Sequence, residues 1–427
     1  MILALFVLLL VCLFIGVPIF ISLAFPSMIA IMFFTDNSPS IIAQRLFGGL
    51  DQFGLMAMPL FIFAAQVMLD GGMARKLLDW SKALVSWMPG GTAFTTHFSS
   101  LFFGALSGSS PATVAAIGGI MYPELEKEKY DRGFSVGLIS SSSSVAIIIP
   151  PSVTMILYGV ATGVSIGSLF IAGIGAGILY TIVLGIYVWY RVKKDKQVVA
   201  EQVPFNPKQF ISVTIKAIWA LGIPFIILGG IYMGIFSPTE AAGISVVYSI
   251  FVSMFIYKEM NVKQLYKSSV KAAVLTAQVM ILTGAAAAFG WILSSAQLPQ
   301  MLANLVLEMN TSPVMFLLLV NVVFLIAGMF MDGSGAIMIL APLVYPIGLA
   351  LGIDPVHLGV IVVTNLAIGM FTPPLGLNLF VANGITGVPF SKMIPSTLPF
   401  LAASLIALAL ITYVEDVSMF LPRLIYP

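Results

Sequence analysis

The apolar residues of this chain run in long continuous segments that are separated by short polar ones. A helix needs about 20 apolar residues to cross about 30 Å of hydrocarbon. That length predicts full membrane crossings at 2–34, 53–69, 133–161, 167–190, 210–233, 238–257, 272–296, 356–385 and 395–414. Within the first of these segments, Pro18 and Pro26 are expected to kink the helix.

Two further apolar stretches, 92–121 and 312–350, are interrupted near their middle. The first interruption is Ser-Gly-Ser-Ser-Pro at 107–111, and the second is Asp-Gly-Ser-Gly at 332–335. Non-helical backbone inside a membrane is tolerated only where protein or a water-filled cavity surrounds it. We therefore predict two re-entrant hairpins whose tips stop near the middle of the membrane.

The composition agrees with a membrane protein and excludes several other classes. With 59% apolar and only 8% charged residues, the chain cannot cover a soluble core with polar surface, and it is too apolar to be disordered. The single cysteine, Cys12, permits neither an internal disulfide nor a thiolate metal cage. His97 and His357 lie far apart in sequence, and we expect both to be packing residues. The dispersed net charge of +2 gives no basic patch for nucleic acid.

The basic residues predict the orientation in the membrane. All but two of the 19 Lys and Arg residues lie in one set of loops or, in the case of Lys216, in the first turns of the helix that follows. The opposite set contains only Arg45 and Arg423. Because cytoplasmic loops carry the basic excess, we expect the amino terminus inside and the carboxyl terminus outside. The loops expected in the cytoplasm are 70–91, 122–132, 191–209, 258–271 and 386–394.

The interruptions and the proline pairs recur at one spacing, which indicates an internal repeat. Pro150-Pro151 and Pro373-Pro374 are 223 residues apart, and the tips Gly108-Ser109 and Gly333-Ser334 are 225 apart. A short interfacial helix is expected before each hairpin, and the topology makes the two hairpins open to opposite sides. Inverted repeats with broken helices in matching positions are typical of secondary transporters. The interfacial helices are expected at Arg75–Met88 and Pro299–Met309.

Four motifs resemble the large membrane subunit of tripartite ATP-independent periplasmic (TRAP) transporters. They are Gly229–Ala242, Gly352–Gly359, Phe371–Gly376 and the run at 103–118. The resemblance implies an elevator-type transporter that works with a periplasmic substrate-binding protein and a small four-helix membrane subunit. It places the chain in a bacterial inner membrane. Since the large-subunit pattern starts at the first residue, we expect the small subunit as a separate polypeptide.

The expected fold is therefore an all-α polytopic membrane protein with inverted repeats, two re-entrant hairpins and two proline-broken helices. Both hairpins and both broken helices are expected to move together against a scaffold formed by the remaining spans and the arms. The predicted parts are an N-terminal scaffold helix (1–52), repeat 1 (53–190), a cytoplasmic loop with scaffold helices and a connector (191–271), repeat 2 (272–414) and a C-terminal tail (415–427).

The first repeat offers oxygen ligands for sodium, a hard cation. A proline frees carbonyls about four residues upstream of itself, so we expect unpaired oxygens at Ala146 and Ile147. Unwound backbone and half-helix ends supply such ligands in transporters. The alternative is that these serines and glycines only allow close helix packing. The predicted first sodium site comprises Ser107, Gly108, Ser109, Ser144, Ala146, Ile147 and Pro150.

In the second repeat, Asp332 is the only charged residue between Asn310 and Asp354. An intramembrane carboxylate indicates a functional site, although Asp332 could also cap the helix that follows. Glu240, by contrast, is expected to complete a capping box with Ser237. The predicted second sodium site comprises Asp332, Gly333, Ser334, Gly369, Met370 and Thr372, and the predicted substrate residues are Ser110, Ser143, Thr154, Asp332, Asn365 and Asn378.

The predicted function is sodium-coupled uptake of an organic acid, because half-helix N-termini directed at the tips suit a carboxylate. The absence of intramembrane Arg or Lys favours sialic acid over a C4-dicarboxylate. A carrier that works without a binding protein is the alternative function. An intramembrane enzyme is disfavoured because the chain lacks a catalytic Ser/His/Asp spacing and a phosphate loop, and a passive channel is the third possibility.

Overall fold

The structure is a computed structural model that describes residues 1–35, 37–194 and 204–425. Every regular element in these ranges is a helix. Eight helices are long and apolar enough to cross a membrane. They are Phe53–Asp70, Ile166–Lys194, Pro207–Tyr232, Pro238–Ile256, Val262–Ser295, Pro313–Phe330, Gly333–Ala350 and Phe390–Tyr413.

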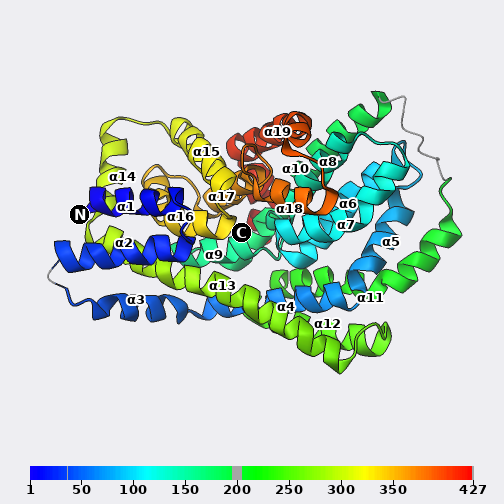
Figure 1. The fold of residues 1–427 in the computed structure, drawn as a ribbon, viewed down its shortest axis with the longest axis horizontal. Helices are drawn as coiled ribbons and strands as arrows, with labels where there is room; N and C mark the ends of the chain where they lie inside the picture. Colours follow the sequence, from blue (N-terminus) through cyan, green and yellow to red (C-terminus); the bar gives the residue numbers. More distant parts are fainter. Residues whose placement is uncertain (36, 195–203, 426–427) are drawn as a thin grey trace.

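The N-terminal segment differs from the prediction of one kinked helix over 2–34. It forms two helices, α1 (Ile2–Phe14) and α2 (Ile19–Phe34), which pack side by side (Figure 1). Gly16 adopts the left-handed region with φ +79°, and Pro18 is extended, so the chain reverses between the helices. With 13 and 16 residues, each is shorter than an ordinary crossing. The cytoplasmic assignment of the amino terminus, which counted one crossing here, loses its basis.

The repeat recurs in the order of the helices. In both halves a long arm helix, a short helix, a helical hairpin, a broken helix and a long helix follow one another. Equivalent elements coincide in spacing, since Val153 and Ile166 begin α9 and α10 and residues 224 positions later begin α18 and α19. The first half contains α4 (Ala57–Asp70), α5 (Met73–Val85), α6 (Gly91–Ser107), α7 (Ser110–Lys127), α8 (Arg132–Ser143), α9 (Val153–Thr162) and α10 (Ile166–Lys194). The second half contains α13 (Val262–Ser295), α14 (Leu298–Glu308), α15 (Pro313–Phe330), α16 (Gly333–Ala350), α17 (Pro355–Gly369), α18 (Leu377–Thr386) and α19 (Phe390–Tyr413).

The arrangement in space is that of an inverted pair. Figure 1 shows α4 running from α3 (Ser40–Leu50) toward α5, while α13 runs in the opposite sense, from α12 (Pro238–Phe251) toward α14. The hairpins α6–α7 and α15–α16 lie on opposite sides of the molecule. α4 and α13 pack against each other along the base of both halves.

Two boundaries and one segment differ from the predicted division. The second arm helix begins at Val262, so most of the predicted connector 258–271 is a continuation of α13. The predicted tail 415–427 contains α20 (Asp416–Ile425), which packs against α10. Residues 195–203 of the predicted basic loop lie outside the described residues. The helices α11 (Pro207–Tyr232) and α12, with the π-helix Val252–Ile256, join the two repeats.

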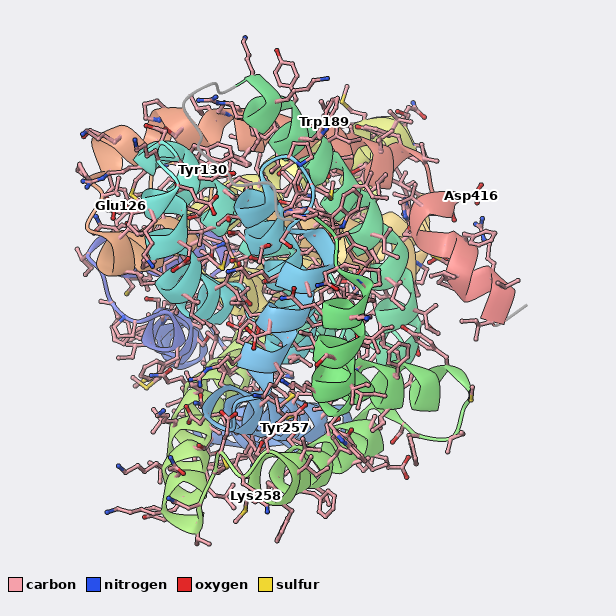
Figure 2. All side chains as sticks on the ribbon, turned by 90° about the vertical axis from the view of Figure 1, so that its right-hand side faces the viewer. Glu126, Tyr130, Trp189, Tyr257, Lys258 and Asp416 are labelled. Atoms are coloured by element: carbon pink, nitrogen blue, oxygen red, sulfur yellow. The ribbon has the colours of Figure 1, made fainter. Side chains whose placement is uncertain are left out.

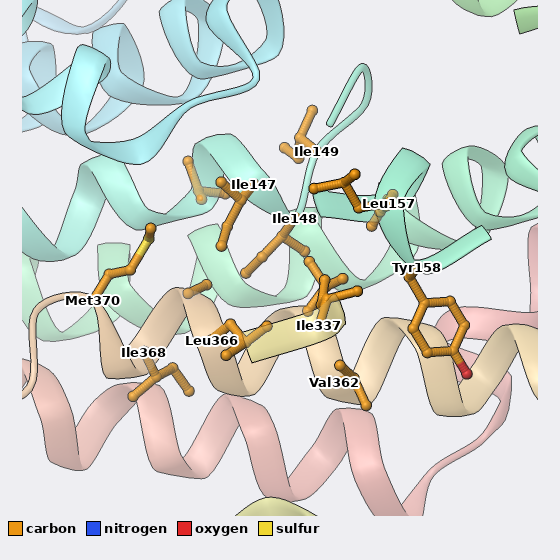
Figure 3. Packing of buried hydrophobic residues seen from close by; sticks show 14 of the residues in the cluster. Ile147, Ile148, Ile149, Leu157, Tyr158, Ile337, Val362, Leu366, Ile368 and Met370 are labelled. Atoms are coloured by element: carbon orange, nitrogen blue, oxygen red, sulfur yellow. The ribbon is translucent and has the colours of Figure 1, made fainter. Parts of the chain in front are cut away.

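The two broken helices meet at the centre of the fold. In the first, α8 tightens into a 3-10 turn at Ser144–Ile147 and resumes as α9 after Pro150-Pro151. In the second, α17 ends at Gly369 and α18 follows Pro373-Pro374, and both Pro-Pro peptide bonds are cis. Figure 3 shows Ile147 and Ile148 above Leu366 and Met370 of the α17 region, so the breaks pack against each other through buried aliphatic side chains.

Repeat-related contacts hold each hairpin against its broken helix. A Cβ on Gly104 of α6 would lie 2.8 Å from the Cα of Ala146. In the second half, a Cβ on Gly369 would lie 2.6 Å from the Cα of Gly328 of α15. These contacts bring backbone against backbone, which leaves no room for a larger residue.

A buried hydroxyl network joins the two halves directly. The Tyr180 hydroxyl lies 2.8 Å from Ser144 Oγ and 3.0 Å from Ser404 Oγ. Tyr180 and Ser404 are 224 residues apart, so they occupy equivalent positions of the two repeats and touch each other. Such a contact marks the pseudo-two-fold axis that relates the halves.

The capping box predicted at the start of α12 is present. Ser237 Oγ accepts a hydrogen bond from Glu240 N at 3.3 Å, and the Glu240 carboxylate accepts one from Ser237 N at 2.8 Å. Loss of an N-cap costs about 1 kcal/mol. We therefore expect Ser237→Ala to lower the free energy of unfolding by about 1 kcal/mol, measured by thermal unfolding of the purified protein.

The matched control for this substitution is Ser269→Ala. The Ser269 hydroxyl donates only to the Tyr266 carbonyl of its own helix, so its loss should leave the unfolding midpoint nearly unchanged. Equal shifts in both variants would contradict the assigned role of the box.

Candidate functional site

A cavity of about 450 Å³ lies where both hairpin tips, both helix breaks and both arm helices meet. The tips α6–α7 and α15–α16 form part of its wall, and α4 and α13 form the opposite part. The lining residues are Ile62, Ala65, Gln66, Leu69, Ser107, Gly108, Ser109, Ser110, Pro111, Ala112, Ala115, Ile147, Val153, Thr154, Leu275, Gln278, Val279, Asp332, Gly333, Ser334, Met370, Leu377 and Val381. The fold thus brings two stretches about 225 residues apart into one site.

The first tip is a tight turn whose hydroxyls bind one another. Gly108 ends α6 in the left-handed region with φ +58°, and an added Cβ would lie 2.7 Å from the Pro151 carbonyl oxygen. Ser107 Oγ lies 2.9 Å from Thr113 Oγ1, and Thr113 Oγ1 also donates to the Ser109 carbonyl at 2.9 Å. Glycine is required here both by the backbone conformation and by the approach of the first break.

At the first break the expectation of a free Ile147 carbonyl is wrong. That oxygen accepts hydrogen bonds from Ser152 Oγ at 2.6 Å and from Thr154 Oγ1 at 3.4 Å. Ser152 also caps α9, since its hydroxyl oxygen accepts from Met155 N. The proline removes the backbone donor, but two hydroxyl groups replace it because a buried carbonyl is costly to leave unpaired.

The second tip carries the carboxylate of the site. Asp332 caps α16, with Oδ1 accepting from Gly335 N at 2.7 Å, so the capping role is confirmed. Its side chain remains partly exposed and lines the cavity. Within the described part of the chain, Asp332 is the only charged residue in the cavity wall. The tip therefore combines a helix N-terminus with one negative charge.

At the second break the carbonyl groups also have partners. The Met370 carbonyl accepts from Asn378 N at 2.8 Å, and the Gly369 carbonyl accepts from Thr372 N at 2.9 Å. Thr372 Oγ1 donates to the Ile368 carbonyl at 2.6 Å. A cation at this break would share oxygens that are already hydrogen-bonded, as carbonyls with two lone pairs allow.

The cavity contains ten of the residues that the sequence predicts for binding. They are Ser107, Gly108, Ser109, Ser110, Ile147, Thr154, Asp332, Gly333, Ser334 and Met370. Eight others lie behind its wall, namely Ser143, Ser144, Ala146, Pro150, Asn365, Gly369, Thr372 and Asn378. The predicted sites therefore divide into a surface layer and a supporting layer.

Asn378 links three elements of the site. Its Nδ2 donates to Ser110 Oγ at 2.7 Å and to the Ser140 carbonyl at 2.9 Å, and its Oδ1 accepts from Ser110 Oγ at 3.0 Å. Asn378 is fully buried, so its amide holds the first tip and α8 against the start of α18. This position couples the two repeats through a single side chain.

A second buried amide, Asn365, is engaged away from the cavity. Its Nδ2 donates to Asn321 Oδ1 at 2.7 Å and to the Ile361 carbonyl at 2.9 Å. In the first repeat the equivalent positions are His97 and Ser142, whose side chains lie 2.8 Å apart. Each pair ties the first helix of a hairpin to the helix that breaks beside it.

Both histidines are packing residues, as expected. His97 is buried, and its second ring nitrogen lies 3.0 Å from the Thr181 carbonyl oxygen. His357 is buried between α17, α19 and α20, with ring nitrogens 2.6 Å from Ser418 Oγ and 3.2 Å from the Thr412 carbonyl oxygen.

Sequence reasoning missed four residues of the site and its support. Gln66 and Gln278 line the cavity from the arms, and Ser152 and Asn321 hydrogen-bond within the supporting layer. An isolated amide within an apolar span was an available signal for the glutamines and Asn321, because polar groups are costly in a membrane. Ser152 follows a proline pair and precedes an apolar run, which is a capping signal.

Comparison with known proteins gives concordant matches over nearly the whole chain. The family described as "Tripartite ATP-independent periplasmic transporter, DctM component" matches residues 6–417. The C4-dicarboxylate TRAP transporter large permease protein DctM of Pseudomonas aeruginosa is 42% identical, over 94% of each chain. The isethionate TRAP transporter permease protein DctMQ of Oleidesulfovibrio alaskensis is 39% identical over 95% of this chain and 64% of that protein.

A sialic acid TRAP transporter large permease protein, SiaM of Vibrio cholerae, is 33% identical over 96% of each chain. Among solved structures, the YdaH transporter of Alcanivorax borkumensis is similar with a TM-score of 0.60, 18% sequence identity and 88% of each chain covered. At that identity the likeness concerns the fold alone.

Proposed function

The chain belongs to the DctM family of large permease subunits of TRAP transporters, and we propose that it imports an organic acid in symport with sodium. It is a multi-pass membrane transporter and not an enzyme. The observation that carries the proposal is the cavity between the hairpin tips, where hydroxyls, carbonyls and one carboxylate converge from both repeats.

The chemistry of this cavity suits a hard cation together with an anionic substrate. Oxygen ligands from unwound backbone suit sodium, and the N-terminus of α16 beside Ser334 suits a carboxylate group. We propose that the two predicted sodium sites lie beside the first and second breaks. The hydroxyls of Ser110 and Thr154 are available to bind substrate from the wall between them.

We propose an elevator mechanism in which the hairpins and broken helices move against the arms. The cavity lies at the boundary between these two parts, because α4 and α13 form one wall and the tips form the other. It extends to Leu69, beside the basic segment 70–91. With basic loops in the cytoplasm, this arrangement corresponds to an inward-facing state.

The proposed topology follows the same rule, with one revision. The basic loops face the cytoplasm of a bacterial inner membrane, and the carboxyl terminus lies in the periplasm. Because α1 and α2 return the chain to the side from which it came, we now place the amino terminus in the periplasm as well.

The proposed partners are a periplasmic substrate-binding protein and a small four-helix membrane subunit encoded separately. The relative named DctMQ supports the second partner, since this chain spans only 64% of that protein. The extra length of the relative leaves room for a fused small subunit.

Sodium coupling supplies enough free energy for concentrative uptake. One sodium ion that enters through about 100 mV releases about 2.3 kcal/mol, and a tenfold gradient adds about 1.4 kcal/mol. Two ions release roughly 7 kcal/mol, of which a monoanion takes back about 2.3 kcal/mol. The remaining ~5 kcal/mol supports accumulation of more than a thousandfold.

For the substrate we propose sialic acid first and a C4-dicarboxylate second. The cavity wall contains hydroxyls and amides but no Lys or Arg among the described residues, which suits a hydroxylated monoanion better than a dianion. The relative named for sialic acid supports the first candidate. The more similar relative named for C4-dicarboxylates supports the second.

The function is tested by uptake into proteoliposomes that contain the chain and its small membrane partner. Labelled sialic acid and a labelled C4-dicarboxylate are supplied with sodium and the binding protein varied independently. We expect concentrative uptake only when both sodium and the binding protein are present.

Each other outcome is informative. Uptake with sodium alone would favour the alternative carrier that needs no binding protein, and uptake without sodium would contradict the coupling. A C4-dicarboxylate transported in place of sialic acid would replace the first substrate candidate and leave the mechanism intact.

A further inference from the structure

A second cavity, of about 470 Å³, lies away from the transport cavity, between α5 and the start of α11. We call it the basic pocket, and it is defined by Lys76, Asp79, Lys82, Phe205, Phe210 and Lys216. None of these residues lines the transport cavity. The pocket therefore needs an explanation of its own.

The charges in the basic pocket favour an anionic ligand. Lys76 is already held by Glu259, with Nζ 3.5 Å from Oε1, and lies 5.8 Å from the centre of the Tyr257 ring. Lys82 and Lys216 form no ion pair within the described part of the chain. Against these three cations the wall offers one carboxylate, that of Asp79. Two ammonium groups thus remain available to a ligand.

The aromatic frame places the pocket at the surface of the membrane. The Trp80 indole donates to Thr214 Oγ1 at 3.1 Å, which joins α5 to α11, and its ring lies 6.3 Å from that of Phe210. Phe205 lies 5.7 Å from Phe210 and 6.4 Å from Trp87. Tryptophan is enriched at the depth of lipid headgroups, and amphipathic helices such as α5 lie in that plane.

The surface next to the pocket is apolar and faces outward. From the pocket, α11 continues as a membrane-crossing helix, and Ile215, Ile218 and Trp219 are exposed on its next turns. Tyr257, labelled in Figure 2, fastens this part of α11, because its hydroxyl donates to the Lys216 carbonyl at 2.9 Å. A ligand with a charged head and apolar chains would match both surfaces.

We propose that the basic pocket binds the phosphate of an anionic phospholipid, with the acyl chains lying along α11. Basic pockets beside membrane helices bind acidic headgroups in this way. Lys82 and Lys216 contact the phosphate from the two helices, and the bound lipid holds α5 against α11. The proposal does not depend on which substrate the transporter carries.

The test is native mass spectrometry of the purified full chain titrated with phosphatidylglycerol or phosphatidylcholine. We expect one phosphatidylglycerol to bind more tightly than phosphatidylcholine. Lys82→Gln with Lys216→Gln should weaken that binding about thirtyfold, since each basic residue near a membrane surface contributes about fivefold. The matched control is Lys263→Gln with Lys267→Gln, which removes the same charge from an exposed part of α13 and should change nothing.

Four results would overturn the proposal. These are an unchanged affinity in the double variant, an equal loss in the control, an equal affinity for phosphatidylcholine, or displacement of the lipid by inorganic phosphate, which would indicate a site for a soluble anion. If the double variant fails to fold, the single variants are measured separately, and each should show about fivefold weaker binding.

Discussion

Asp332→Asn is expected to leave the protein folded and to raise the sodium concentration for half-maximal uptake at least tenfold. Asparagine can still cap α16, because its amide oxygen accepts from Gly335 N as the carboxylate does. What it removes is the only charge in the cavity wall within the described residues. A hydrogen bond or ion contact with a charged group contributes about 1.5–3 kcal/mol, which corresponds to about a 10- to 100-fold effect.

The measurement is the sodium dependence of uptake in proteoliposomes, and Asp354→Asn is its matched control. Asp354 also caps a helix, with Oδ1 accepting from Val356 N at 2.8 Å, but it lies outside the cavity. Uptake and sodium dependence in the control should equal those of the wild type. If Asp332→Asn did the same, the carboxylate would be only a helix cap.

Gly369→Ala is expected to prevent correct folding or to destabilise the protein severely. The new Cβ would lie 2.6 Å from the Cα of Gly328 and 2.9 Å from the Leu325 carbonyl oxygen. Both neighbours are backbone, so α15 and α17 would have to move apart. Overpacking of this kind typically costs about 1–3 kcal/mol, and a crossing of two backbones without flexible side chains gives little relief.

The effect is measured as the yield of monodisperse protein and the midpoint of thermal unfolding. Gly384→Ala is the control, because it lies in α18 with no atom within 4 Å of the added Cβ. That variant should be as stable as the wild type or slightly more stable. Gly328→Ala lies outside the predicted sodium site and should be destabilised too, which separates packing from binding. A stable Gly369→Ala protein would contradict the packing argument.

The features that the sequence predicted are those carried by local signals. Prolines and polar tips inside apolar runs predicted both breaks and both hairpins, because such residues have one meaning within a membrane. The spacing of Gly108 and Gly333 predicted the repeat, and the structure brings these two tips into one cavity. Asp332 was identified for its charge alone.

The features that were missed depend on contacts between distant residues. The Ile147 carbonyl lost its helical donor as expected, but it gained the hydroxyl of Ser152, which no spacing rule about prolines includes. Gln278 lies in an arm helix, and only the tertiary fold brings it to the cavity. At the N-terminus, Gly16 allowed the chain to reverse where Pro18 alone predicts a kink.

The contact between Tyr180 and Ser404 has a consequence for how such a chain can diverge. If one repeat unit assembled as a symmetric dimer, the residue on the axis would have to face its own copy, so that both sides were large or both were small. Once the two units are joined in one polypeptide, each side can mutate independently. Here a large phenol on one side and a small hydroxyl on the other share a hydrogen bond of 3.0 Å. Covalent fusion thus permits an unequal pairing that two identical subunits could not make.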